Sequence, residues 1–130
     1  MSQENVEVVR QMFKAWSSGD RDAARAAFDE NVVFIMPPID ATVSYGVPDA
    51  ERAVEAWRRS WEDYSVEVEE LIDGGEHVVA ISRQRGRGKA SGTEVDLISA
   101  FVCTLRASKI IRAEVFETKG QALEAAGLSE

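Results

Sequence analysis

The sequence predicts an α+β protein in which a curved antiparallel sheet carries its helices on one side. Two observations predict this class. Amphipathic, helix-like segments occupy the chain up to about residue 63, interrupted by a single strand-like segment. Four segments with the alternation typical of strands then follow one another over residues 65–118, joined by turn sequences. Helices that precede such a meander are expected to cover one face of the sheet.

Two helices are expected at the start of the chain. Over residues 4–17, apolar side chains recur at three- and four-residue spacing and form one stripe of a helix, made of Val6, Val9, Met12, Phe13 and Trp16. Gly19 interrupts this pattern, and Asp20 can cap the free amide groups of a second, shorter helix. The inner face of that second helix is expected to consist of Ala23, Ala24, Ala27 and Phe28.

A strand and a third helix follow. The β-rich residues 31–36 end at Pro37 and Pro38, which lack the amide donors that continue a strand, and a loop is expected from there to Val47. Pro48 suits the first turn of a helix, which is expected to end near Asp63. Its inward stripe is expected to contain Ala53, Trp57 and Trp61.

The meander begins with a hairpin. Residues 65–72 and 77–85 read as two strands joined by the turn Asp73-Gly74-Gly75, and a glycine-rich, basic connection follows over residues 86–92. Residues 95–105 and 109–118 read as the last two strands.

Composition restricts the class of protein. A chain of 130 residues with 45% hydrophobic side chains can form one domain, residues 1–130, with a core that needs no disulfide. The net charge of −8 argues against nucleic acid and against an anionic membrane as partners, because both require positive potential. A single cysteine, and an N-terminus without the features of a secretory signal, predict a cytoplasmic protein.

Several local sequences, in this order along the chain, carry a resemblance to a known family. They are the Gly19-Asp20 corner, Ser91-Gly92 before a long strand, Ser108-Lys109-Ile110 at the last turn, and residues 121–128 at the end. Over residues 6–128 the chain resembles SnoaL-like, or polyketide cyclase-like, proteins of the nuclear-transport-factor-2-like superfamily. The resemblance implies a cystatin-like fold, in which three helices from the first half of the chain and the sheet enclose a conical cavity. It also implies a homodimer formed through the exposed face of the sheet, where Ile110 and Phe116 are expected.

The resemblance also indicates where catalytic groups would stand, and these positions lack them. Ketosteroid isomerases of the superfamily use an Asp, a Tyr and a protonated Asp, whose positions fall here on Met36, Met12 and Ser99. SnoaL-type cyclases use an Asp and a His, whose positions fall on Val115 and Phe101. None of these side chains can transfer a proton from carbon, so neither mechanism is expected.

Strand alternation predicts a mostly apolar cavity, which suits a small hydrophobic molecule held by one or two polar contacts. The alternative is that the same side chains interdigitate and leave no void. The residues expected to bind the ligand are Met12, Trp16, Phe34, Met36, Tyr45, Trp57, Trp61, Ile81, Ser99, Phe101, Ala113 and Val115.

Glu117 and Arg83 are the candidate catalytic pair. Both are expected to face the cavity, where desolvation could adapt the carboxylate to acid–base work and the guanidinium could orient a ligand. The alternative is an ordinary ion pair or a solvated strand end. A register error of one residue would turn Glu117 and Arg83 outward, and the residues brought in instead would be Glu114, Arg112, Ser82 and Gln84.

The remaining candidate groups are interpreted as structural. His77, the only histidine, lies beside a turn and has no partners for a metal site, so no metal and no cofactor are expected. Cys103 is expected in the core. The alternating arginines 83, 85 and 87 are expected to neutralise carboxylates such as Glu67 and Glu69.

The sequence therefore predicts a protein that binds a small apolar molecule. Enzymatic activity of the cyclase, isomerase or hydrolase type would have to use groups other than the usual Asp, His and Tyr. The alternative is a non-catalytic domain that senses a ligand or dimerises.

Overall fold

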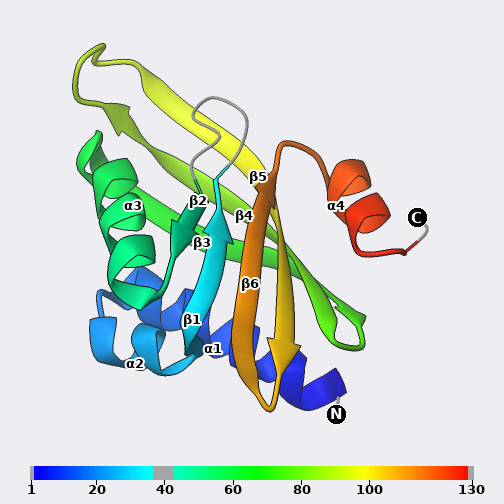
Figure 1. Ribbon diagram of the computed structural model, residues 1–130. Coiled ribbons are helices and arrows are strands. Elements are labelled where there is room, and N and C mark those ends of the chain that lie inside the picture. Colours follow the sequence, from blue (N-terminus) through cyan, green and yellow to red (C-terminus); the bar gives the residue numbers. More distant parts are fainter. Residues whose placement is uncertain (1, 37–42, 129–130) are drawn as a thin grey trace.

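The structure, a computed structural model, describes residues 2–36 and 43–128 (Figure 1). The N-terminal half contains three helices and two strands: α1 (Ser2–Ser18), α2 (Arg21–Ala26), β1 (Phe28–Ile35), β2 (Val43–Tyr45) and α3 (Val47–Arg59). The C-terminal half contains four strands and a helix: β3 (Trp61–Gly74), β4 (His77–Gly88), β5 (Glu94–Arg106), β6 (Lys109–Phe116) and α4 (Lys119–Ala125). Pro37 and Pro38, which were expected to end the first strand, lie outside the described residues.

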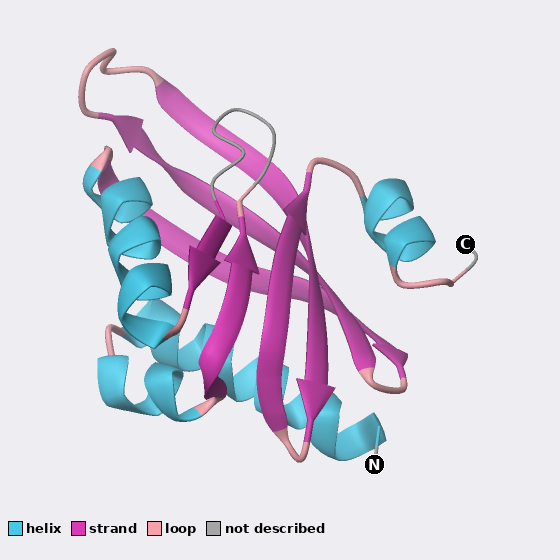
Figure 2. Ribbon diagram, viewed as in Figure 1, coloured by secondary structure: helices cyan, strands magenta, loops and turns pink. Residues whose placement is uncertain are grey.

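The described strands form one twisted sheet in the order β2-β1-β6-β5-β4-β3 (Figure 2). All neighbours are antiparallel except β1 and β6, which run parallel and place Phe34 beside Ala113. The predicted α+β class with helices beside a curved sheet is confirmed. The parallel pair was not predicted, because alternation within a segment identifies a strand but not its partner.

The two faces of the sheet carry separate cores. The face toward α1, α2 and α3, called here the cavity face, packs against Val9, Met12 and Phe13 of α1, as the predicted helix stripe requires. The opposite or outer face packs against Ala122 and Leu123 of α4. Figure 1 shows α4 on its own side of the sheet, away from the other helices.

Two aromatic residues expected in helices begin strands instead. Phe28 opens β1, and Trp61 opens β3 because α3 ends at Arg59 with Ser60 as its C-cap. Trp61 is 8% exposed and lies against Gly86 of β4, where an added Cβ would come within 2.7 Å of its ring. The close approach to a glycine on the neighbouring strand places Trp61 in the sheet.

Helix α4 was not predicted, although its N-terminus carries a recognisable signal. The Thr118 hydroxyl accepts a hydrogen bond from the Gln121 amide, and the Gln121 side chain accepts one from the Thr118 amide. This reciprocal arrangement is a capping box, which the spacing Thr-x-x-Gln indicates. The helix covers part of the outer face of β4 and β5, which closes that part to a second subunit.

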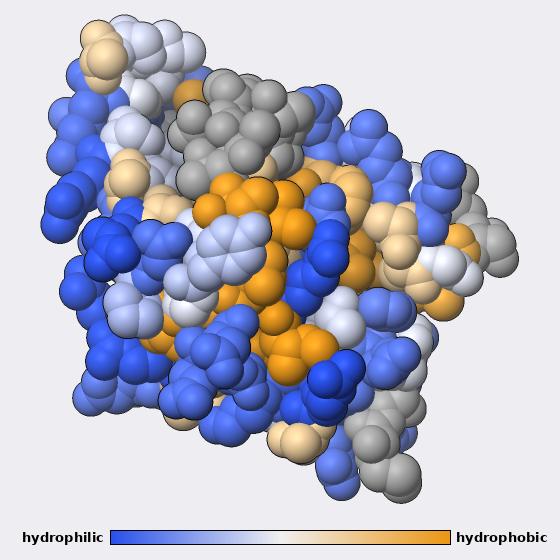
Figure 3. Space-filling model, viewed as in Figure 1, coloured by the Kyte–Doolittle hydropathy of each residue, from blue (hydrophilic) through white to orange (hydrophobic). Residues whose placement is uncertain are grey.

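Neither of the two residues expected at a dimer interface is exposed on the outer face. Ile110 is fully buried in the core of the cavity face, and Phe116 packs beside α4. Ile110 turns inward because the pairing of β5 and β6 shifts after Thr104, so Ile111 is an extra residue in the ladder. Figure 3 shows apolar side chains gathered over β1 and β6, and a dimer through the outer face would have to use this part of the sheet.

A membrane-spanning segment is not found among the helices of the described residues.

Candidate functional site

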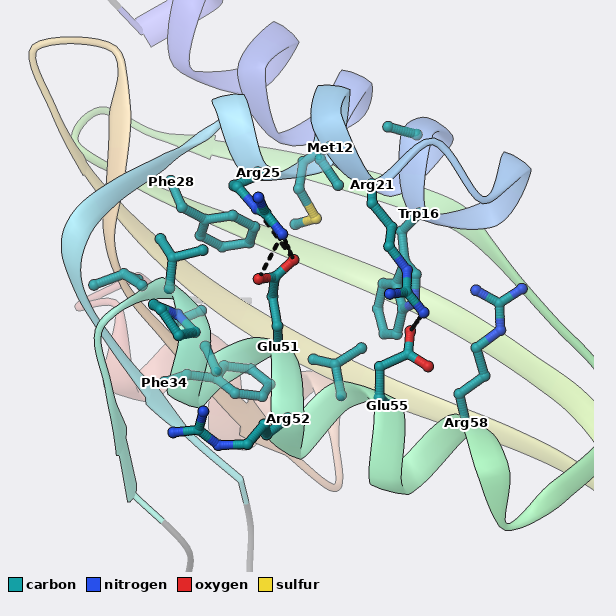
Figure 4. A pocket seen from close by; sticks show the side chains of 18 of the residues that line it. Met12, Trp16, Arg21, Arg25, Phe28, Phe34, Glu51, Arg52, Glu55 and Arg58 are labelled. Atoms are coloured by element: carbon teal, nitrogen blue, oxygen red, sulfur yellow. Dashed lines mark hydrogen bonds and ion pairs between the residues drawn. The ribbon is translucent and has the colours of Figure 1, made fainter.

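A cavity of about 630 Å³ lies between α1, α2, α3 and the cavity face of the sheet (Figure 4). Its floor is apolar and takes side chains from α1 and from three neighbouring strands. The floor residues are Met12, Trp16, Phe28, Val32, Phe34, Phe101 and Ala113. These residues carry no ionisable group.

Sheet register explains how the floor is assembled. Phe34 pairs with Ala113 across β1 and β6, while Phe101 pairs with Val115 across β5 and β6. Phe101 is fixed by an edge-on contact with Phe13 of α1, with ring centroids 5.2 Å apart. The small side chain of Ala113 fills little of the space between its larger neighbours, and four more alanines line the cavity. Short side chains on the three helices and on β6 therefore leave the volume open.

Two ion pairs span the mouth of the cavity and join α2 to α3 (Figure 4). Arg25 donates to both carboxylate oxygens of Glu51, at 2.9 and 2.8 Å, and Arg21 lies 2.8 Å from Glu55. Helix α2 buries none of its side chains and is capped by Asp20, whose carboxylate accepts a hydrogen bond from the Ala23 amide. The ion pairs are thus the polar links between this short helix and α3.

A buried polar cluster lies behind Trp16, beside the cavity. Gln84, which is 3% exposed, accepts hydrogen bonds through Oε1 from Trp57 Nε1 at 2.8 Å and from the Tyr64 hydroxyl at 2.6 Å. Its Nε2 donates to the Ser99 hydroxyl at 3.1 Å. Burial raises the pKa of Tyr64 to about 12. The cluster joins α3, β3, β4 and β5, and its Tyr64 ring lies 6.4 Å from that of Trp16.

Five of the residues predicted to bind a ligand line the cavity: Met12, Trp16, Phe34, Phe101 and Ala113. Met36 and Val115 pack against the same core but do not reach the cavity. Trp57 and Ser99 belong to the polar cluster, and Trp61 packs edge-on against Trp57 with centroids 5.4 Å apart. Tyr45 is 69% exposed on β2.

The expectation that Ile81 and Arg83 face the cavity is wrong. Ile81 lies in the core under α4, on the outer face. Arg83, two residues on, shares that face and forms ion pairs with Glu69 and Asp96, both at 2.9 Å. Ser82 and Gln84 take the inward positions, as the one-residue shift in register requires.

Glu117 does not meet Arg83. Its side chain is exposed just beyond the end of β6, and its backbone amide donates to the Gln121 side chain at the start of α4. The structure therefore does not bring the candidate catalytic pair together, and it places neither residue in the cavity.

The arginines of β4 pair with carboxylates of β3 and β5, as expected. Arg83 pairs with Glu69, and Arg85 pairs with Glu67.

Cys103 lies in the core, as expected. It is fully buried, and burial raises the pKa of its thiol to about 12. Within the described residues, no three His, Cys, Asp or Glu side chains gather as a metal site requires.

The ion pairs at the mouth were missed by sequence reasoning. A signal for them exists, because Arg21 and Arg25 are four residues apart on α2, and Glu51 and Glu55 have the same spacing on α3. Such spacing places each pair of like charges on one face of its helix. It does not reveal that the two faces oppose each other.

The comparisons with known proteins agree with this architecture. A family model for the SnoaL-like domain matches residues 9–113, and no curated protein matches the chain. A protein of Jannaschia sp. CCS1 that carries the name SnoaL-like polyketide cyclase is similar in structure, with a TM-score of 0.80 and 24% identity over 96% of this chain and 92% of that one.

Two further solved structures share the fold. A hypothetical protein of Catenulispora acidiphila DSM 44928 with a ketosteroid isomerase-like fold, in complex with trimethylamine, has a TM-score of 0.75 and 18% identity over 95% and 94% of the two chains. TerC co-crystallised with polyporic acid has a TM-score of 0.79 and 16% identity over 95% and 98%. The family match covers most of the chain and confirms the resemblance: this chain belongs to the SnoaL-like domain family.

Proposed function

We propose that this protein binds a small, largely apolar molecule in the cavity between α1, α2, α3 and the sheet. The observation that carries the proposal is the unfilled volume of about 630 Å³ above a floor of aromatic and aliphatic side chains. Ligand pockets in proteins have volumes of roughly 300–1,000 Å³ and are lined mainly by such side chains. Transfer of an apolar molecule from water onto this floor is favourable by about 25 cal/mol per Å² of buried surface.

The family supports a small-molecule ligand without identifying it. Two proteins of the same fold were crystallised with small organic molecules, trimethylamine in one case and polyporic acid in the other. These ligands belong to those proteins. For this chain they support the proposal that the space between the helices and the sheet accepts a ligand.

Binding, rather than acid–base catalysis, is the activity that the cavity supports. The resemblance to the family assigns Met12 and Phe101 to two of the positions where relatives carry catalytic groups, and both offer the cavity apolar surface. Both oxygens of Glu51 at the mouth are engaged by Arg25. A carboxylate whose two oxygens already accept hydrogen bonds within the protein would have to leave its partner before it could contact a substrate. We therefore favour a ligand-binding or ligand-sensing role.

The proposal can be tested by filling the floor of the cavity. The substitution Ala113→Leu adds a branched side chain between Phe34 and Phe101, and Ala125→Leu makes the same change at an exposed site on α4. We expect the uncharged probe N-phenyl-1-naphthylamine to bind the unmodified protein and the Ala125→Leu variant with saturable fluorescence enhancement. Ala113→Leu should weaken this binding about tenfold or more while the free energy of unfolding is maintained.

The opposite result is equally specific. If the floor is already filled, the added side chain overpacks the core and lowers the free energy of unfolding by about 1–3 kcal/mol. That loss, together with an unmodified protein that shows no saturable binding of the probe, would overturn the proposed function.

A further inference from the structure

We propose that the ligand is an apolar carboxylate, whose carboxylate group binds Arg58 at the rim while its apolar body occupies the cavity. The inference rests on the proposed function and adds to it the chemical class of the ligand and the residue that selects it.

Charge at the cavity differs from that of the chain as a whole. Five arginines and three carboxylates line the cavity, and a fourth carboxylate, Asp49, is paired with Arg52 at its edge, which leaves a local excess of one positive charge in a protein with a net charge of −8. A local field of this sign attracts anions and raises their concentration at the mouth. A neutral or cationic ligand would gain nothing from it.

Arg58 differs from the other arginines of the rim. Arg21, Arg25 and Arg52 are exposed, and each is paired with a carboxylate. Arg59 is exposed to water. Arg58 is half-buried, and no ion pair or side-chain hydrogen bond joins it to another of the described residues. A guanidinium has five N–H donors, and partial burial without an acceptor is unfavourable.

The position of Arg58 suits contact with a molecule in the cavity. Figure 4 places Arg58 on the same side of the cavity as Trp16, whereas Arg25 and Glu51 lie beside Phe28. The charge of Arg58 acts on the nearby Tyr64 hydroxyl, where it opposes the effect of burial on the pKa. Because the Tyr64 hydroxyl already donates its hydrogen to Gln84, it does not compete with Arg58 as a donor to an incoming anion.

The geometry of a guanidinium selects among anions. Its planar fork matches the two oxygens of a carboxylate and can form two parallel hydrogen bonds with them. A molecule anchored in this way at the rim extends its apolar part across Trp16 toward Met12 and Phe34. Straight-chain and aromatic acids of moderate size have this combination of one charged end and an apolar body.

The experiment compares decanoate with decanol, which share a chain and differ in charge. Each competes with N-phenyl-1-naphthylamine for the protein at neutral pH and low salt. We expect the unmodified protein to prefer decanoate about tenfold. Arg58→Gln should lose this preference and bind decanol as before, whereas Arg58→Lys should keep part of it. Arg106→Gln, which removes an exposed arginine at the turn between β5 and β6, should keep the full preference.

Each outcome bears on one claim. Equal binding of decanoate and decanol by the unmodified protein would overturn the assignment of an anionic ligand and leave the proposed function in place. A preference that survives Arg58→Gln would overturn the role of Arg58. Failure of both compounds and the probe to bind would overturn the proposed function itself. Retained binding of decanol by Arg58→Gln shows that the variant is folded.

Discussion

Arg25 of α2 holds both carboxylate oxygens of Glu51 of α3, at 2.9 and 2.8 Å, across the mouth of an apolar cavity. Helix α2 has six residues and buries none of them. Helices this short are not stable by themselves, so α2 depends on its cap and its contacts with neighbouring elements. The ion pairs of Arg25 and Arg21 therefore hold the element that borders the entrance.

Removing the Glu51 charge should loosen α2. In Glu51→Gln, we expect amide hydrogen exchange over residues 21–26 to become several-fold faster and the probe to associate faster, with a smaller change in affinity. High salt should have a similar effect on the unmodified protein, because exposed ion pairs are screened. The matched control is Glu7→Gln, which breaks the exposed Glu7–Arg10 pair on α1. Equal exchange over residues 21–26 in all three proteins would show that the ion pairs do not hold α2.

Removing the Gln84 amide should destabilise the protein strongly. Gln84→Met preserves the length of the side chain but leaves Trp57, Tyr64 and Ser99 without their partner. Each buried polar group left unsatisfied costs about 1–3 kcal/mol, so we expect the free energy of unfolding in urea to fall by about 2–4 kcal/mol. Gln3→Leu, at an exposed position of α1, should have little effect. A loss below about 1 kcal/mol would mean that the cluster is hydrated.

The pKa of Tyr64 gives a pH dependence with a defined sign. Burial raises it from 10.0 to about 12, so between these values the unfolded chain has lost a proton that the folded protein retains. The contribution of Tyr64 to stability is full below pH 10 and decreases as the pH rises toward 12. Urea unfolding at pH 9 and pH 11 should show a larger loss in the unmodified protein than in Tyr64→Phe. Equal losses would place Tyr64 in contact with water.

The sequence predicts the faces of some elements and not of others. On α1 the apolar stripe has one buried side, and Met12 and Trp16 were placed correctly. On β4 the consecutive residues Val78 to Ser82 are all buried, because helices cover both faces of the sheet there. Where both faces of a strand are covered, the alternation of apolar and polar residues does not show which face is which. The residues predicted to face the cavity were therefore wrong by one position along β4.

Trp61 was misplaced for a related reason. It follows Trp57 by four residues, the spacing of a continuing helix stripe, and it is identified as part of the sheet by its pairing with Gly88 and its contact with Gly86, both on another strand. The ion pairs at the mouth join helices that are distant in sequence. Features of this kind depend on tertiary contacts, which a local pattern does not contain.

The parallel pairing of β1 with β6 has a consequence for how the cavity comes into existence. Strands β3 to β6 each pair with their neighbour in sequence, and β1 pairs with β2 in the same way, but the β1–β2 pair can join the rest of the sheet only after β6, the last strand, has been made. Closing so long a loop is entropically costly and favours late docking of β1. The floor of the cavity takes Phe34 from β1 and Ala113 from β6. A chain that stops before its last strand therefore cannot assemble this floor. Ligand binding would therefore report on completion of synthesis and folding of the whole domain.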